Sequence, residues 1–290
     1  MKICRFDQNR VGVVRDGQVF DATDIANDVA LDQVWSSQGD PLIGALPAFL
    51  ARASASMHEM RALPLEHIAL LSPVASPSKI VAAPVNYRAH ITEMIDNPVA
   101  ATHALRDIGK AGLFLKANSS LAGPSEGIAI RFPERRTDHE VELVVVIGKK
   151  GSDIRLGDAR EHIAGYCLGL DISLRGPEDR SFRKSMDGYS IVGPWMVTPD
   201  EVADHSDLEI SLSINGEVRQ KANTKDLVYG VERLIEFASS FYTLYPGDLL
   251  FTGTPDGVGP IRPGDVIHAQ GQGLGAMTVT VRRHQPQVLP

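Results

Sequence analysis

The segment at residues 138–147 restricts the possible folds of this chain more than any other. Its second half, residues 143–147, consists of β-branched and aliphatic side chains and is followed by Gly148, a pattern typical of a β-strand. Polar residues do not alternate with apolar ones there, so we expect other elements to cover both faces of the strand. Such a strand belongs to the interior of a sheet.

Acidic residues stand at the beginning of this segment. Glu140 and Glu142 are two residues apart, so on a strand their side chains point to the same face, and Asp138 would share that face. Carboxylates side by side on a covered strand repel one another and lose hydration, so a positive charge must lie beside them. A divalent cation bound by oxygen ligands is one interpretation. A structural ion-pair cluster with Arg135, Arg136 or another basic residue is the other, and this segment alone leaves both open.

The composition limits the class of protein. The chain has 290 residues, of which 43% are hydrophobic and 22% charged, as in ordinary soluble globular proteins. Its net charge of −7 argues against nucleic acid or an anionic membrane as the main partner. No apolar run approaches the roughly 18 residues of a membrane span, and no signal peptide is visible. Cys4 and Cys167 lack metal-binding spacing, so we expect buried free thiols and a cytoplasmic protein.

Two units are expected along the chain. The first, residues 1–75, combines short strands at 3–6, 11–14 and 19–20 with helical patterns at 25–35 and 42–53. A connector rich in proline and serine follows, and we place the boundary there, which gives a second unit at residues 76–290. This second unit contains many short strands, an Asn215-Gly216 hairpin turn and one amphipathic helix at 227–241. The prediction is an α+β fold that is mostly β, rather than a doubly wound sheet.

Several other segments carry reactive side chains, although each has an ordinary explanation by itself. His90 and Glu93 would share a helical face, which is more often a surface pair than a catalytic dyad. Asp171 ends an apolar strand, where it could simply be a strand-end acid, and the charged segment at 175–184 could be a solvated face. The glycines at 271–275 lack dinucleotide-binding spacing and precede a strand, so we reject a nucleotide site there.

The order of these segments resembles the fumarylacetoacetate hydrolase family over roughly residues 79–283. The matching motifs are Asn86-Tyr87-x-x-His90-x-x-Glu93, Phe114-Leu115-Lys116, His139-Glu140-Val141-Glu142-Leu143, Asp171-Ile172-Ser173-x-Arg175, Lys184-Ser185-Met186-Asp187, Gly193-Pro194-Trp195, Thr252-Gly253-Thr254-Pro255-x-Gly257-Val258-Gly259 and Gly264-Asp265. The resemblance implies a mixed β-sandwich roll with a small N-terminal domain, a divalent cation, and a homodimer.

The resemblance also implies roles for individual residues. The metal ligands would be Glu140, Glu142 and Asp171, with Mg²⁺ as the ion and Mn²⁺ or Ca²⁺ as alternatives. The catalytic residues would be Lys184, which faces substrate and metal, and the dyad His90 and Glu93, which activates water or acts as acid and base. The implied substrate-binding residues are Tyr87, Lys116, Arg175, Gly253 and Thr254.

This chain departs from the family pattern at positions that would line the pocket. The usual Gly-Leu-Asn-Tyr is Pro84-Val85-Asn86-Tyr87, and the common Ser-Ala-Arg-Asp is Ser173-Leu174-Arg175-Gly176. A frequent glutamine is Glu178 here, and Asp187-Gly188-Tyr189 replaces the usual Asp-Thr-Phe or Asp-Thr-Cys. These changes, together with a possible helical lid at residues 95–112, leave the substrate undetermined but the metal ligands intact.

The chemistry of these residue types agrees with the resemblance. Three carboxylates suit a hard divalent cation, which acts as a Lewis acid on a chelating 2-oxo or diketo acid. A lysine adds positive charge there, and a histidine oriented by a glutamate can deprotonate water. We therefore predict a Mg²⁺-dependent hydrolase that cleaves a carbon–carbon bond in a small acylpyruvate-like or other diketo acid, in the catabolism of aromatic or related compounds. The alternatives are an oxaloacetate-type decarboxylase, a 2-hydroxymuconate-type isomerase, and a metal-stabilised binding module without activity.

Overall fold

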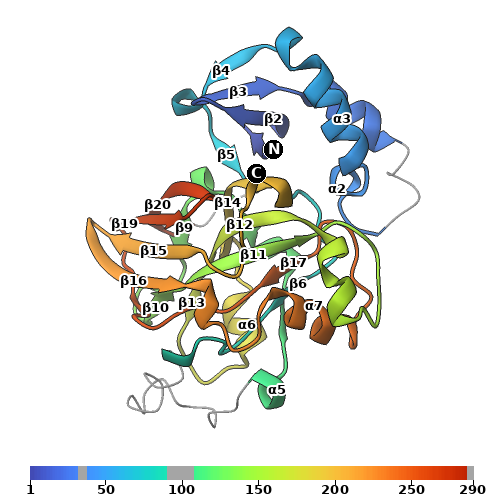
Figure 1. The fold of residues 1–290 in the computed structure, drawn as a ribbon. Helices are drawn as coiled ribbons and strands as arrows, with labels where there is room; N and C mark the ends of the chain where they lie inside the picture. Colours follow the sequence, from blue (N-terminus) through green and yellow to red (C-terminus); the bar gives the residue numbers. More distant parts are fainter. Residues whose placement is uncertain (32–37, 90–107, 286–290) are drawn as a thin grey trace, which may run out of the picture.

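A computed structural model describes residues 1–31, 38–89 and 108–285 of the chain, and within these ranges strands predominate (Figure 1). Twelve strands form one large sheet, whose main path runs β4-β3-β2-β1-β14-β12-β11-β17-β6-β7, with β5 beside β1 and β8 beside β14. Their bounds are β1 Lys2–Phe6, β2 Arg10–Arg15, β3 Gln18–Asp21, β4 Ala62–Pro64, β5 Leu70–Leu71, β6 Ile80–Ala82, β7 Phe114–Lys116, β8 Leu121–Ala122, β11 Val141–Ile147, β12 Ile163–Asp171, β14 Ser190–Val197 and β17 Leu249–Phe251. The prediction of a mostly β, α+β fold is confirmed.

Two smaller sheets complete the strand structure of the described ranges. The first has five strands in the order β16-β15-β19-β20-β9, and the second has three in the order β13-β10-β18. Their bounds are β9 Ile128–Ile130, β10 Thr137–His139, β13 Ser173–Leu174, β15 Glu209–Ile214, β16 Glu217–Asn223, β18 Gly259–Pro260, β19 Val266–Gly271 and β20 Gly275–Arg283. The predicted Asn-Gly hairpin joins β15 to β16, with φ of 52° at Asn215 and 86° at Gly216, as that turn requires.

Strand β11 lies between two hydrophobic cores, as its apolar sequence predicts. Leu143, Val145 and Ile147 pack in one core with residues of the five-stranded sheet, whereas Val144 and Val146 pack in the other. Every residue of β11 is buried. Because successive side chains of a strand point to opposite faces, a continuous apolar run is what a strand covered on both sides needs.

The leading residues extend the main sheet rather than forming a separate one. Strand β1 pairs antiparallel with β14, with Lys2 opposite Val197 and Ile3 opposite Met196. Ile3 shares one core with Phe49 of the leading unit and Val144 of β11. Figure 1 shows the leading strands and helices, in blue, at one end of the molecule. The division at residues 75 and 76 stays a prediction.

Helices are short and few within the described ranges. They are α1 Thr23–Ala30, α2 Pro41–Gly44, α3 Leu46–Ser56, α5 Ile108–Ala111, α6 Arg180–Lys184 and α7 Val231–Ser239. The helix predicted at 227–241 is shorter than expected: α7 buries Val231, Leu234, Ile235 and Ala238, whereas Phe241 lies beyond its end and is 69% exposed. Residues Leu156–His162 form a 3₁₀ helix. Part of the pattern at 25–35 lies outside the described residues. None of the helices described is both long and apolar enough to cross a membrane.

Candidate metal centre

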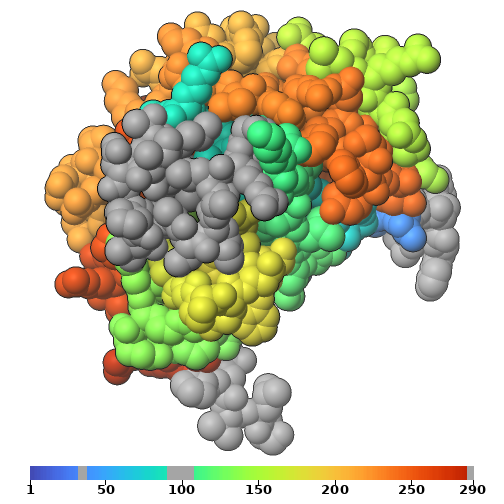
Figure 2. Space-filling view, turned by 90° about the horizontal axis from the view of Figure 1, so that it is seen from below, coloured from blue at the N-terminus to red at the C-terminus, as the bar shows by residue number. Residues whose placement is uncertain are grey.

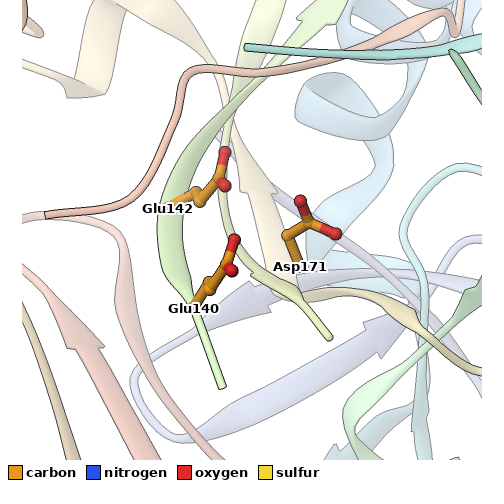
Figure 3. A group of neighbouring side chains, drawn as sticks. All are labelled: Glu140, Glu142 and Asp171. Atoms are coloured by element: carbon orange, nitrogen blue, oxygen red, sulfur yellow. The ribbon is translucent and has the colours of Figure 1, made fainter. Parts of the chain in front are cut away.

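Three carboxylates converge where β11 and β12 meet. Glu140 immediately precedes β11, Glu142 is its second residue, and Asp171 ends β12. The two strands are antiparallel, and the Asp171 backbone N–H donates to the Glu140 carbonyl oxygen at 2.9 Å. Figure 3 shows the three side chains pointing toward one another, and one ligand oxygen from each lies within 4.8 Å of the others. All three residues are buried.

This oxygen set fits a hard divalent cation. Two oxygens bound to one ion are at most twice the bond length apart, which is about 4.2 Å for Mg²⁺ and about 5 Å for Ca²⁺. The ligand oxygens, which all lie within 4.8 Å of one another, are therefore close enough together to share one ion of this kind. The residues that would hold the ion are Glu140, Glu142 and Asp171.

Two buried lysines flank the carboxylates. Lys184 Nζ donates to Glu140 Oε2 and to Asp171 Oδ2, both at 2.6 Å. Lys116 Nζ donates to the other oxygen of Asp171, and to the Tyr189 carbonyl oxygen at 2.8 Å. Asp171 is thus held from both sides. Lys184 contacts two of the proposed metal ligands, and its catalytic role stays a prediction. Lys116, predicted to bind substrate, contacts a proposed metal ligand, and its side chain is fully buried.

Burial and charge act differently on these groups. Burial raises the pKa of Glu142 well above its ordinary value, and the charge of Asp171 raises it further. Burial alone would lower the pKa of Lys184, but the charges of Asp171 and Glu140 outweigh burial and raise it. Burial does lower the pKa of Lys116, which bonds one carboxylate rather than two. The charged form of Glu142 is therefore disfavoured unless a further positive charge lies beside it.

The ion-pair interpretation of this segment holds for Asp138 but not for Glu142. Asp138 accepts from Arg136 Nε and from Arg175 Nε, both at 2.7 Å, and Arg175 also donates to Glu140 at 2.9 Å. Within the part of the chain that the structure describes, Glu142 makes no ion pair. Its Oε2 atom accepts a hydrogen bond from the Gly253 backbone N–H at 2.6 Å. A bound cation would supply the positive charge that the described residues do not pair with this buried carboxylate.

The loop after β17 is fastened to the strand that carries the glutamates. Thr252 and Thr254 hydroxyls donate to the carbonyl oxygens of Leu143 and Val141, both at 2.9 Å. Gly253 has a φ of 98°, and a Cβ there would lie 2.8 Å from Asn86 Cβ, so only glycine fits without strain. The predicted substrate contact of this loop stays a prediction.

A protein-family model described as fumarylacetoacetate (FAA) hydrolase C-terminal matches residues 79–282 of the chain. The chain belongs to the fumarylacetoacetate hydrolase family. It is 50% identical over 287 residues to maleylpyruvate hydrolase of Aquipseudomonas alcaligenes, with 97% of this chain and 99% of that protein covered. The predicted family is confirmed.

Other members of the fumarylacetoacetate hydrolase family are similar over large parts of the chain. The crystal structure of maleylpyruvate hydrolase from Sphingobium sp. SYK-6, in complex with manganese(II) and pyruvate, is 35% identical with a TM-score of 0.83 and covers 98% of this chain and 100% of that one. Mitochondrial oxaloacetate tautomerase FAHD2A of Homo sapiens is 37% identical over 219 residues, or 73% of this chain and 67% of that protein. The hydrolase names agree with the predicted reaction class, and a solved structure named 2-hydroxyhepta-2,4-diene-1,7-dioate isomerase agrees with the isomerase alternative.

Two predicted residues of the fumarylacetoacetate hydrolase site, His90 and Glu93, lie outside the described residues, as does most of the predicted lid at 95–112. Tyr87 is described, and its hydroxyl is buried without a hydrogen-bond partner among the described residues. Burial raises the pKa of Tyr87, and the charge of Glu142 adds to this effect. The predicted substrate contact of Tyr87 stays a prediction.

Two departures from the family pattern have one structural explanation. Glu178 accepts two hydrogen bonds from the guanidinium of Arg135, at 2.7 and 2.9 Å. A Cβ at Gly176 would overlap the tips of both side chains. The bidentate pair therefore occupies the space that the usual aspartate at position 176 would need. Glu178, which replaces the usual glutamine, is one member of this pair. Arg135 also donates to the Arg175 carbonyl oxygen at 3.0 Å, so the pair braces the segment after Asp171.

Gln220 is a residue of the centre that the sequence does not reveal. Its buried side chain accepts from the Val141 backbone N–H and contacts His139 Nδ1, both at 3.0 Å. Its amide donates to Thr254 Oγ1 at 2.9 Å and to the Pro255 carbonyl oxygen at 3.0 Å. Gln220 therefore ties the strand of metal ligands to the loop at Gly253. Its place on β16 follows an ordinary hairpin turn, so nothing local distinguishes it.

Proposed function

We propose that this protein is a metal-dependent hydrolase of acylpyruvates, with maleylpyruvate as the first substrate to test. The observation that carries this proposal is the convergence of three buried carboxylates, one of them without an ion pair within the described ranges, beside Lys184. The names of the similar proteins support it. Hydrolysis would yield pyruvate and the carboxylic acid of the acyl group. We further propose Mg²⁺ or Mn²⁺ as the ion, a homodimer, and a cytoplasmic location.

The proposed reaction gives each described residue a task. A divalent cation bound by the three carboxylates would polarise the oxygens of a 2-oxo acid and stabilise the negative charge that develops as the carbon–carbon bond breaks. Lys184 adds a second positive charge at the same place. Lys116 fixes the orientation of Asp171, and the Gly253 N–H fixes that of Glu142. His90, oriented by Glu93, is the proposed base that takes a proton from water.

Removal of the metal tests whether the proposed activity depends on a bound ion. Protein dialysed against EDTA should lose maleylpyruvate cleavage, followed as the decay of enol absorbance, and regain it with Mn²⁺ or Mg²⁺. The matched variants are Glu142→Gln, which removes a proposed ligand charge, and Glu161→Gln, which alters an exposed carboxylate. Full activity in protein shown by elemental analysis to be metal-free would overturn the proposal.

Water labelled with ¹⁸O tests whether the reaction is a hydrolysis. In H₂¹⁸O, hydrolysis places the label in the carboxylate of the acyl product, maleate. A tautomerase or isomerase, as some relatives are named, would convert the substrate without releasing pyruvate or labelled acid. Turnover without a labelled product would therefore assign the site to the alternative reactions.

A further inference from the structure

Arg180 is oriented toward the same side of α6 as the catalytic lysine. It is the first residue of α6, four residues before Lys184, so the two side chains lie on one face of the helix. The guanidinium of Arg180 and the ammonium of Lys184 each lie 5.5 Å from the centre of the Phe114 ring, which belongs to β7. Between them in sequence, Phe182 points away and is 74% exposed.

The neighbouring arginines form hydrogen bonds, whereas Arg180 forms none with the described residues. Arg135 and Arg175 bond carboxylates, and Arg183 donates to the carbonyl oxygens of Leu174 and Glu178. Within residues 1–31, 38–89 and 108–285, Arg180 forms no hydrogen bond or ion pair, and its guanidinium lies over the aromatic face of Phe114. A half-buried guanidinium keeps five donors that favour a planar anion, and a carboxylate satisfies two of them at once.

The position of Arg180 suits the far end of a small substrate. Because both cations lie 5.5 Å from one ring centre, they are no more than twice that distance apart. Lys184 lies at the proposed metal ligands, since it bonds Glu140 and Asp171, so a substrate bound there would have one end beside Lys184. In Figure 2 the part of the chain around α6, in yellow, reaches the surface beside the green residues around β7, with which α6 is in contact. A short substrate held at the ligands can thus extend toward Arg180.

We propose that Arg180 binds a carboxylate at the acyl end of the substrate, so that the preferred substrates are acylpyruvates with two carboxylates. This inference rests on the proposed function. The oxo-acid end would bind at Glu140, Glu142 and Asp171, and the acyl carboxylate would form a bidentate ion pair with Arg180. A maleyl group carries such a carboxylate, whereas an acetyl group does not.

A comparison of two substrates in the metal-loaded protein tests this. Arg180→Gln should lower kcat/KM for maleylpyruvate by about 10- to 100-fold, mainly through KM, as loss of a charge-assisted hydrogen-bonded pair does. The same variant should leave kcat/KM for acetylpyruvate within about two-fold. Arg180→Lys keeps the positive charge but cannot form the bidentate pair, so it should recover part of the loss in kcat/KM for maleylpyruvate. Phe182→Ala, on the exposed side of α6, is the control and should change neither substrate.

The outcomes separate this inference from the proposed function. If the wild-type protein cleaves neither substrate with any of the metals, the proposed function fails. If it cleaves both, but Arg180→Gln affects them equally or affects neither, only the role of Arg180 is overturned. Melting temperatures of the variants identify a loss of fold, and Arg180→Lys provides the same comparison in a protein that keeps the cation.

Discussion

At the scale of single residues, Glu142 differs from the other buried acids of the centre. Asp138, Glu140 and Asp171 each accept hydrogen bonds from lysine or arginine, whereas Glu142 accepts one from a backbone N–H. Burial and the charge of Asp171 both raise the pKa of Glu142. Its negative charge is therefore destabilising until a cation binds.

Glu142→Gln should separate stability from metal binding. The amide keeps an oxygen for the Gly253 N–H but removes the buried charge, so the metal-free protein should gain about 1–3 kcal/mol in its free energy of unfolding. Metal-dependent activity should fall on the order of 100-fold or more. Thermal denaturation with and without MnCl₂ checks both effects. A variant that is less stable without metal, yet still stabilised by manganese, would contradict this account.

Gln220 should matter for both the loop and the reaction. Gln220→Met has a similar volume but leaves the Val141 N–H and the Pro255 carbonyl without this partner, so we expect a loss of about 2–4 kcal/mol. Because the loop that orients Glu142 is released, kcat should fall about ten-fold as well. Lys221→Gln, at the exposed neighbouring position, is the control. An unchanged kcat in a destabilised Gln220→Met protein would limit Gln220 to a purely structural role.

At the scale of elements, the strands could be predicted where side chains determine them locally. The apolar run of β11 and the Asn-Gly turn after β15 both correspond to observed structure. The helices were less predictable: the pattern at 42–53 divides at Ala45 into α2 and α3. The bidentate pair of Arg135 with Glu178 and the bonds of Gln220 join residues far apart in sequence, and no local pattern encodes such partners. The grouping of Glu140, Glu142 and Asp171 was predictable because the family motifs contain these three residues.

Asp40 connects α2 to residues 75 and 76, on either side of the predicted boundary of the leading unit. Its Oδ1 atom accepts from Leu42 and Ile43 at the start of α2, and its Oδ2 atom accepts from Ala75 and Ser76. Asp40→Ala leaves four backbone N–H groups without these acceptors, so we expect a loss of about 2–4 kcal/mol in denaturant unfolding. Asp40→Asn keeps one oxygen and should lose about half as much. Equal stability of the alanine and asparagine variants would show that the pair of bonds retained by asparagine contributes nothing.

At the scale of the whole molecule, the leading unit and the rest share a sheet and a core. The pairing of β1 with β14, and the contacts of Ile3 and Phe49 in the core with Val144, join the two parts. The leading unit should therefore not unfold by itself. We expect one calorimetric transition, with equal calorimetric and van't Hoff enthalpies. Two transitions, or a protease-resistant fragment beginning near residue 76, would instead support an independent leading domain.

The bidentate pair of Arg135 with Glu178 also bears on how this chain can vary. A side chain at position 176 would meet the tips of Arg135 and Glu178, so those tips would have to move. Both tips are the ends of flexible, partly exposed side chains, so the movement costs little. The pair therefore fits a glycine at position 176 without locking it: an aspartate there would weaken the contact of Arg135 with Glu178 rather than prevent folding.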